Sequence, residues 1–402
     1  MDKPVYLYVT PFFPSPESWR GGFCLDAAKA LIRDGRYDVR VLTTGRGGDY
    51  EWDGVKVLRM RRLVAPCGLV PFLLAPVNND IFRRKLRNAG IDVSKVAVCH
   101  ANTFPFGHYV SYFKRLNPSA KAIVQIHSSF NPVLRSGRLG LVPVHAAWLY
   151  LYYRRVLRGV DLLAFVSEMA RRTFGKCYAG APEGEARDAR RQLLAGRWLP
   201  ELGLPRSMVV YNGIDTALFS PLGRKPHEGF VIGCVANFDP LKDHLTLLRA
   251  VGRLKDRIPG LKVRLVGSGP TLGECRRYVE ANGLGGVVSF EREMDHRAMP
   301  DFYRSLDLIV LPSRLEGFAC TCVESWACGT PVLFCKGLGL SEVLSVGEGE
   351  RWGFSPQDAD ELARKILAFE ENRWEQKLNR DLDINHLWSE FLDVLDEPTP
   401  PA

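Results

Sequence analysis

Two series of short, apolar, β-branched segments alternate with helical patterns, and this alternation limits the fold more than any other feature of the sequence. The first series contains the candidate strands Val5–Thr10, Tyr37–Thr43, Val55–Met60, Val96–His100, Ala122–His127 and Leu162–Ser167. The second series contains Phe230–Ala236, Lys262–Val266, Val287–Phe290, Leu306–Leu311 and Pro331–Cys335. Strands that alternate with helices are typical of βαβ units and parallel sheets. We therefore predict an α/β chain with two doubly wound, Rossmann-like domains.

The polar, proline-containing stretch Ser220–Gly229 separates the two series and is typical of a linker. We predict a first domain over residues 1–217 and a second over residues 218–381. The amphipathic segment Leu382–Leu395 predicts a helix over 382–396 that packs back on the first domain. Ligands of doubly wound sheets bind outside the carboxyl ends of the strands, so we expect a crevice where the two domains face each other.

Charge is divided unevenly along the chain. Residues 1–210 hold 32 Lys and Arg against 16 Asp and Glu, and no acidic residue lies between Asp92 and Asp161. Basic clusters flank apolar and aromatic segments there, and their members are Arg59, Arg61, Arg62, Arg83, Arg84, Lys85, Arg87, Arg154, Arg155 and Arg158. This pattern favours an anionic membrane surface as a partner, with core packing beside solvated arginines as the alternative. No nucleic-acid-binding motif accompanies the charge, so we expect no nucleic-acid partner.

The sequence predicts a cytoplasmic, peripheral protein. Met1-Asp2-Lys3 runs directly into the apolar stretch Val5–Thr10 without the pattern of a signal peptide. The longest uncharged runs, Leu63–Asn79 and Leu139–Tyr153, are too short to span a bilayer. The ten cysteines lack framework or CxxC spacing, so we expect reduced thiols that serve as small apolar residues.

Two glutamates follow the candidate strand Leu306–Leu311 at the place where a ligand is expected. Glu316 and Gly317 lie on the loop after this strand, and a helix beginning near Ala319 carries Glu324 in its second turn. A glycine permits close approach of a ligand to the backbone, and the amino end of a helix suits a diphosphate. Carboxylates at this spacing can accept hydrogen bonds from sugar hydroxyls. An acidic loop before an ordinary helix is the structural alternative.

This segment resembles the Glu-x7-Glu motif of family-four retaining glycosyltransferases, which have the two-domain GT-B fold. Four further motifs extend the resemblance over nearly the whole chain, and they are Ser167-Glu168, Asn212–Asp215, Val266–Pro270 and Ala327–Val332. The resemblance implies that Glu324 binds the nucleotide ribose and that Glu316 contacts hydroxyls of the donor sugar.

The resemblance to this family extends to three other positions, Lys242, Asn237 and His127. Lys242 follows a strand end, where an ammonium group can neutralise the donor diphosphate, and Asn237 occupies the place of the family's arginine. His127 ends a strand and is similar to the family's strand-end histidine, although Ser128 stands where aspartate often follows. A core histidine is the alternative for His127, and a surface lysine for Lys242. We predict His127, Glu316 and Lys242 as catalytic residues. The predicted donor-binding residues are Gly21, Gly22, Asn237, Lys242, Gly267, Gly317, Phe318, Ala319 and Glu324.

The resemblance implies transfer of a hexosyl unit from a UDP- or GDP-linked sugar to a lipid-linked, polysaccharide or lipopolysaccharide acceptor, with retention of anomeric configuration. We expect no cofactor and no metal, because the Asp381-Leu-Asp383 sequence lies in the carboxyl-terminal tail, away from strand-end loops. The expected place is the cytoplasmic face of the inner membrane. A soluble enzyme that glycosylates a small metabolite and a non-catalytic nucleotide-sugar-binding or scaffolding homologue remain alternatives.

Overall fold

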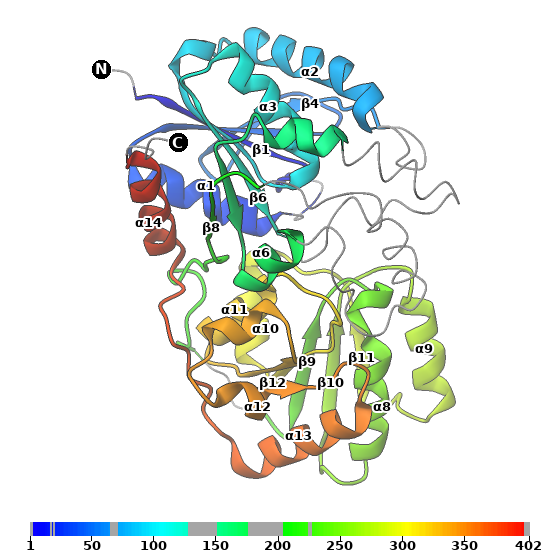
Figure 1. Ribbon diagram of the computed structural model, residues 1–402. Coiled ribbons are helices and arrows are strands. Elements are labelled where there is room, and N and C mark those ends of the chain that lie inside the picture. The colour runs from blue at the N-terminus through cyan, green and yellow to red at the C-terminus, as the bar shows by residue number, and fades with distance from the viewer. Residues whose placement is uncertain are drawn as a thin grey trace. The chain divides into compact units, whose positions relative to one another are not determined.

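The chain forms two compact units in the computed structural model, which describes residues 3–16, 18, 21–64, 71–127, 151–175, 204–223 and 227–397 (Figure 1). The first unit contains Met1–Tyr211 and Leu387–Ala402, and the second contains Asn212–His386. The division therefore falls at Tyr211 and Asn212, a few residues before the position 217 expected from the sequence.

The first unit is built on an eight-stranded sheet with the order β3-β4-β2-β1-β5-β6-β7-β8. Its strands are β1 (Val5–Thr10), β2 (Asp38–Thr44), β3 (Tyr50–Trp52), β4 (Val55–Met60), β5 (Val96–Ala101), β6 (Lys121–Ile126), β7 (Leu162–Phe165) and β8 (Ser207–Val209). Every pairing is parallel except that of the short edge strand β3 with β4. The parallel strands therefore end along one edge of the sheet.

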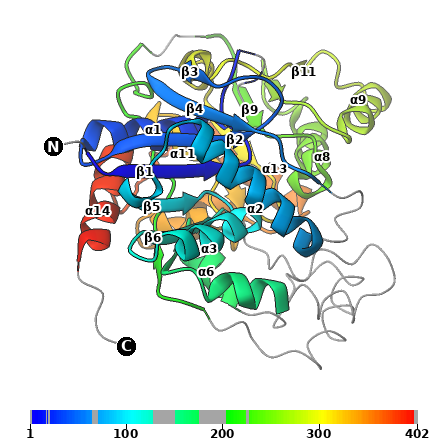
Figure 2. The ribbon, with the colours of Figure 1, turned by 90° about the horizontal axis from the view of Figure 1, so that it is seen from above.

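Helices cover both faces of this sheet (Figures 1 and 2). They are α1 (Gly22–Asp34), α2 (Pro71–Asn88), α3 (Gly107–Leu116), α6 (Glu168–Gly175) and α14 (Ile384–Asp396), with the short turns η2 (Val93–Lys95) and η3 (Phe104–Phe106). The tail helix α14 packs by an aromatic cluster: the Trp388 ring centroid lies 6.3 Å from that of Tyr8 and 5.9 Å from that of His100. Arg36 adds ion pairs of 2.6 Å to Asp393 and 3.0 Å to Asp396 on the same helix.

The second unit contains a fully parallel six-stranded sheet with the order β11-β10-β9-β12-β13-β14. The strands are β9 (Val231–Val235), β10 (Lys262–Val266), β11 (Val288–Glu291), β12 (Leu308–Leu311), β13 (Val332–Cys335) and β14 (Gly353–Phe354). The strand order reverses between β9 and β12, and this switch point is where doubly wound sheets bind ligands.

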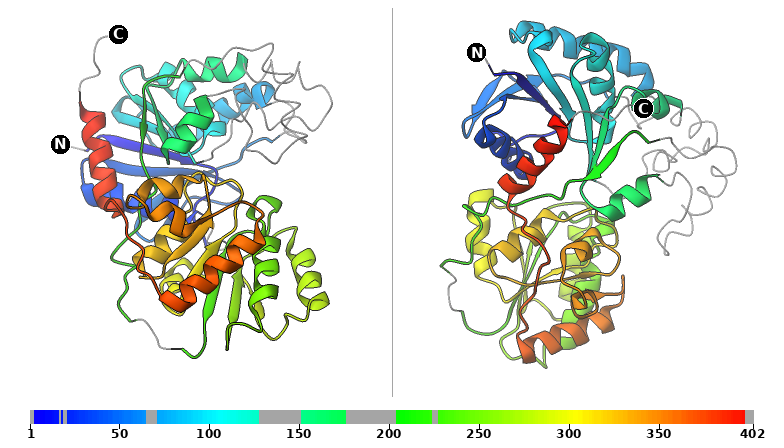
Figure 3. Two further views of the ribbon diagram at one scale, coloured as in Figure 1. Left: turned by 60° about the horizontal axis from the view of Figure 1, so that its bottom comes forward. Right: turned by 60° about the vertical axis from the view of Figure 1, so that its left-hand side comes forward.

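The helices of the second unit are α8 (His244–Leu254), α9 (Leu272–Ala281), α10 (Met299–Arg304), α11 (Cys320–Ala327), α12 (Glu348–Trp352) and α13 (Ala359–Asn372) (Figure 3). The turns η4 (Pro240–Lys242), η5 (His296–Ala298) and η6 (Gly339–Val343) connect them to the strands. Helix α8 packs against both α9 and α13, and α10 packs against α11.

The predicted fold class is confirmed: every strand expected from the sequence is present within two residues of its expected limits. Three short strands, β3, β8 and β14, were not predicted. In the described part of the chain, no helix combines the length and hydropathy needed to cross a bilayer.

Candidate functional site

An ion pair joins the two loops at the switch point of the second sheet. Lys242 ends the turn η4 after β9, and its Nζ donates a hydrogen bond to Oε2 of Glu316, which lies in the loop after β12. The Lys242 side chain is 25% exposed and that of Glu316 is 19% exposed. Solvent and ligands can therefore reach this pair, although it is partly withdrawn from water.

Arg314 holds these two loops together independently of the ion pair. Its backbone N–H donates to the Leu241 carbonyl at 2.8 Å, and its Nη2 donates to the Pro240 carbonyl at 3.0 Å. Both contacts lie within two residues of Lys242. These contacts to the backbone fix the loop that carries Lys242. The Lys242 ammonium group can therefore pair with another anion in place of Glu316 while the loop keeps its conformation.

Glu324 is buried on the inner side of α11 and is hydrogen bonded to a tyrosine. The Tyr303 hydroxyl donates to Oε2 of Glu324 at 2.6 Å, and Nδ1 of His296 lies 4.0 Å from Oε1. Burial, together with the Glu324 charge, raises the pKa of Tyr303 well above its usual value, so this hydroxyl keeps its proton and remains a donor. Tyr303 was not predicted, because no local sequence signal connects a tyrosine in α10 to a glutamate 21 residues later.

The amino end of α11 completes this side of the site. Gly317, Phe318 and Ala319 lead from Glu316 into the helix, and Ala319 is the residue before its first turn. The Asn212 side chain donates to the Phe318 carbonyl at 3.3 Å, which ties the Asn212–Asp215 turn to this loop. The first backbone N–H groups of a helix lack intrahelical partners, so they can bind an anion here.

Glycines allow the loops after β9 and β10 to touch through their backbones. Gly267 has φ 144°, and a Cβ atom on it would lie 2.2 Å from the Ala236 carbonyl oxygen. Gly269 is similarly close to the Phe238 carbonyl, at 2.4 Å. Asn237 lies between these two contacts. The predicted donor residues Asn237 and Gly267 are therefore adjacent, and larger side chains are excluded at the glycines.

His244 lies directly behind Lys242 at the beginning of α8. Its ring stacks on that of Phe238, with centroids 4.1 Å apart and an interplanar angle of 13°. Burial and the neighbouring Lys242 ammonium lower the pKa of His244 to about 4. A neutral ring at this position avoids a second positive charge behind Lys242.

In the first unit, Gly21 and Gly22 lie where the chain leaves β1 and enters α1. Gly21 has φ 94°, and its carbonyl accepts the backbone hydrogen bonds of Cys24 and Leu25. A Cβ atom on Gly21 would approach the Phe12 carbonyl oxygen to 3.0 Å. The glycine therefore permits the turn by which the chain enters the helix.

His127 follows β6 directly and belongs to a polar chain at the carboxyl end of the first sheet. Its Nε2 lies 2.5 Å from Oδ1 of Asn102, whose Nδ2 donates to the Cys24 sulfur at 2.9 Å. Because Asn102 accepts through Oδ1, Nε2 of His127 carries the proton and Nδ1 holds a lone pair. Burial lowers the pKa of His127 to about 4. Asn102 was missed by the sequence analysis, although a polar residue directly after β5 was a usable signal.

Other residues discussed from the sequence have structural partners. Asp383 accepts backbone hydrogen bonds from Asn385 and His386 and a hydrogen bond from the Thr216 hydroxyl, so it caps α14. Within the residues that the structure describes, no group of three or more His, Cys, Asp or Glu side chains has the arrangement of a metal site. The described cysteines are free thiols, and all but Cys320 are buried.

In the basic cluster on α2 the three arginines are exposed, Lys85 is partly buried, and several members are paired. Arg83 and Arg84 both contact Asp80, at 2.9 and 2.7 Å, and Lys85 lies 2.5 Å from Asp49. Arg87 on the same helix is exposed. Ser128, residues 65–70 and the aromatic positions before Leu151 lie outside the described residues, so the structure describes only part of the predicted membrane-facing surface.

Comparison with solved structures gives the class of fold. Sucrose-phosphate synthase from Thermosynechococcus elongatus is similar with a TM-score of 0.70 and 19% identity, over 98% of this chain and 99% of that chain. The Anabaena protein HepE, solved in complex with UDP and glucose, gives a TM-score of 0.67 and 18% identity over the same shares. The chain therefore has the GT-B fold of glycosyltransferases.

Sequence comparison gives the family. Residues 219–386 match the family model described as glycosyl transferases group 1, which agrees with the resemblance found in the sequence. D-inositol 3-phosphate glycosyltransferase 2 of Catenulispora acidiphila is 31% identical over 35% of this chain and 37% of its own length. The putative glycosyltransferase EpsF of Bacillus subtilis is 32% identical over 38% of this chain and 45% of its own length. The matched segments thus span less than half of these relatives.

Proposed function

We propose that the protein is a retaining glycosyltransferase that transfers a hexosyl unit from a nucleotide-diphosphate sugar to a hydroxyl group. The main support is the Lys242–Glu316 ion pair at the switch point of the second sheet. The loop that holds Glu316 leads into α11, the helix that bears Glu324. A cation, a helix amino end and two carboxylates suit the diphosphate, the ribose and the sugar hydroxyls of such a donor. The complex of HepE with UDP and glucose supports a uridine nucleotide.

In this proposal, the chain acts by charge stabilisation and positioning. The Lys242 ammonium moves from Glu316 to the diphosphate and stabilises the negative charge that grows on the leaving group. Glu316, once released, accepts hydrogen bonds from the donor sugar. Tyr303 fixes the carboxylate of Glu324 for the ribose, and the neutral His127 offers its Nδ1 lone pair to a hydroxyl group.

Cationic and backbone groups serve the diphosphate here, so we propose a reaction without metal or cofactor. Activity that persists in EDTA supports this assignment. Complete loss in EDTA, with recovery on addition of Mg²⁺ or Mn²⁺, contradicts it.

For the acceptor we propose a lipid-linked or polysaccharide hydroxyl, used by a peripheral enzyme at the cytoplasmic membrane face. The excess of cations in residues 1–210 supports an acceptor held at an anionic surface. A small phosphorylated acceptor is the second candidate, since relatives named for D-inositol 3-phosphate and sucrose-phosphate are similar to this chain. Transfer assays with lipid extracts and with soluble sugar and inositol phosphates distinguish these acceptors.

A screen of nucleotide sugars by thermal shift tests the function itself, because a ligand that binds the folded state raises the melting temperature. We expect a shift with UDP-sugars or GDP-sugars and slow donor hydrolysis without acceptor. A shift without hydrolysis or transfer favours the non-catalytic homologue. The absence of any shift contradicts the proposal.

A further inference from the structure

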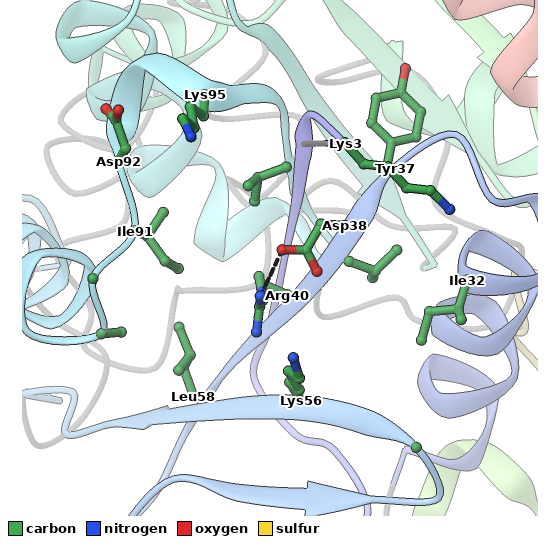
Figure 4. Close-up of a pocket in the computed structure, with 15 residues that line it drawn as sticks. Lys3, Ile32, Tyr37, Asp38, Arg40, Lys56, Leu58, Ile91, Asp92 and Lys95 are labelled. Carbon is green, nitrogen blue, oxygen red and sulfur yellow. Dashed lines mark hydrogen bonds and ion pairs between the residues drawn. The ribbon is translucent and has the colours of Figure 1, made fainter. Parts of the chain in front are cut away.

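A cavity of about 690 Å³ lies in the first unit (Figure 4). It lies at the opposite strand ends from Gly21 and His127. Its lining includes Val5 at the beginning of β1, Asp38 at the beginning of β2, and Lys95 directly before β5. It is thus formed by the amino ends of parallel strands, whereas the predicted substrate residues follow carboxyl ends. Neither the family comparison nor the proposed function uses this cavity.

Positive charge dominates the lining. The lining contains four cationic residues, Lys3, Arg40, Lys56 and Lys95, and two carboxylates, Asp38 and Asp92, so its net formal charge is +2. Both carboxylates have structural roles. Asp38 accepts from Nε and Nη2 of Arg40 at 3.0 and 2.6 Å, and Asp92 accepts from the backbone N–H and hydroxyl of Ser94 at 2.9 and 2.7 Å.

Asp38 contacts one edge of the Arg40 guanidinium and thereby orients it; the dashed line in Figure 4 marks this contact. The contact uses Nε and Nη2 and leaves Nη1 available to a ligand. Lys56 lies on β4, which is the parallel neighbour of β2, with Val57 opposite Val41. Arg40 and Lys56 therefore occupy adjacent positions on neighbouring strands. Among the residues that the structure describes, neither Lys3 nor Lys56 forms an ion pair.

Apolar side chains share the cavity with these cations. Ile32, Leu58 and Ile91 line it from α1, β4 and the segment after α2, and Ile32 is 40% exposed. A cavity that combines a cationic part with an apolar part fits a ligand that has both an anionic group and an apolar group. A simple inorganic ion would leave the apolar part in contact with water.

We propose that this cavity binds a phosphate monoester that carries an apolar body. The monoester has a charge of about −1.5 to −2 at neutral pH, which matches the lining, and its oxygens accept charge-assisted hydrogen bonds from arginine and lysine. Such a group occurs in free phosphorylated metabolites and in the headgroup of phosphatidic acid. This inference does not rest on the proposed transferase activity, because its site and its test are separate from the donor residues.

Calorimetric titration of the full chain tests the site with octyl phosphate and with inorganic phosphate. We expect saturable binding of octyl phosphate, at least tenfold tighter than inorganic phosphate because the octyl chain covers the apolar part. The double variant Lys3→Gln/Lys56→Gln should weaken octyl phosphate binding at least tenfold. Leu58→Asn should reduce the preference for octyl phosphate while retaining inorganic phosphate binding.

Lys121→Gln is the matched control, because Lys121 begins β6 of the same sheet but does not line the cavity. This control should change octyl phosphate affinity less than twofold, and melting curves verify that each variant is folded. Cosedimentation with phosphatidylcholine vesicles, with and without phosphatidic acid, identifies the source. Phosphatidic-acid-dependent sedimentation that the double variant loses assigns a lipid headgroup, and soluble binding alone assigns a metabolite. Absence of saturable binding to every probe, or equal losses in the double variant and the control, overturns the proposal.

Discussion

Lys242 and Glu316 form an ion pair although 74 positions separate them in the sequence. The pair exists because β9 and β12 are neighbours at the point where the order of the second sheet reverses. Each partner is a predicted ligand for a different part of the donor. The site therefore holds its cation and its carboxylate together, and the proposed function requires that a bound donor separates them.

Separate substitutions of these partners should have different kinetic effects. Lys242→Ala should reduce kcat and donor affinity, because charge-assisted hydrogen bonds to a diphosphate contribute about 1.5–3 kcal/mol. Glu316→Gln should mainly reduce kcat, while UDP affinity stays within about threefold, since this glutamate is assigned to the sugar. Steady-state kinetics and UDP titration check both variants. A tenfold loss of UDP affinity in Glu316→Gln would contradict the assignment.

The hydrogen bond from Tyr303 to Glu324 gives a second test of the donor site. Tyr303→Phe removes only the hydroxyl at 2.6 Å from Oε2 and should weaken nucleotide binding, because the Glu324 carboxylate loses its fixed orientation. Glu324→Ala should weaken binding further, by about 1.5–3 kcal/mol. Calorimetry with UDP measures both effects. Tyr278→Phe on α9 is the control, and unchanged UDP affinity in Glu324→Ala would remove the ribose assignment.

The strands and the two-unit plan could be predicted because a parallel sheet buried on both faces leaves apolar β-branched runs in the sequence. Strands β3, β8 and β14 were missed because each has two or three residues and depends on its neighbour for pairing. The positions of Glu316 and Glu324 followed from a strand, a loop and a helix in sequence order. Tyr303, Arg314 and Asn102 could not be predicted in this way, because each meets its partner, within its own unit, through tertiary contacts between segments that carry no shared local pattern.

The close contact of Gly267 predicts a specific loss of stability. Gly267→Ala places a methyl group 2.2 Å from the Ala236 carbonyl oxygen at φ 144°, so the loops after β9 and β10 must separate or strain. Strain of this kind costs about 1–3 kcal/mol. Gly252→Ala in α8 is the control, because its Cβ atom would meet nothing within 4 Å and alanine favours a helix. Denaturant unfolding should show a loss for the first variant and no loss for the second.

Histidines whose pKa is lowered in the folded chain predict that stability falls under mildly acidic conditions. Burial lowers the pKa of His127 and of His244 to about 4, and that of His100 to about 3, from an ordinary 6.5. Between about pH 4 and 6.5 the unfolded chain therefore binds more protons than the folded chain, and the unfolding free energy decreases as pH decreases. Each group contributes at most about 1.4 kcal/mol per pH unit.

The contribution of His127 can be isolated by substitution. The melting temperature should fall from pH 7 to pH 5 in the wild type, and His127→Gln should show a smaller fall because one of the titrating groups is absent. Calorimetric melting at several pH values checks this expectation. Equal pH dependence in the two proteins would show that His127 has an ordinary pKa in the folded state.

The basic cluster of α2 predicts electrostatic membrane binding that is separate from the donor site. Replacement of Arg83, Arg84, Lys85 and Arg87 by serine should reduce cosedimentation with anionic vesicles, since each cation near the surface contributes about 1 kcal/mol. Wild-type binding should also decrease as salt rises, because the attraction decays over about 8–10 Å at physiological ionic strength. Asp80 and Asp49 lose these ion-pair partners in the variant, although Asp49 keeps its hydrogen bond from the Arg59 backbone N–H, so a melting curve must accompany the measurement. UDP affinity should remain unchanged. Equal wild-type binding to neutral and anionic vesicles would contradict the electrostatic explanation.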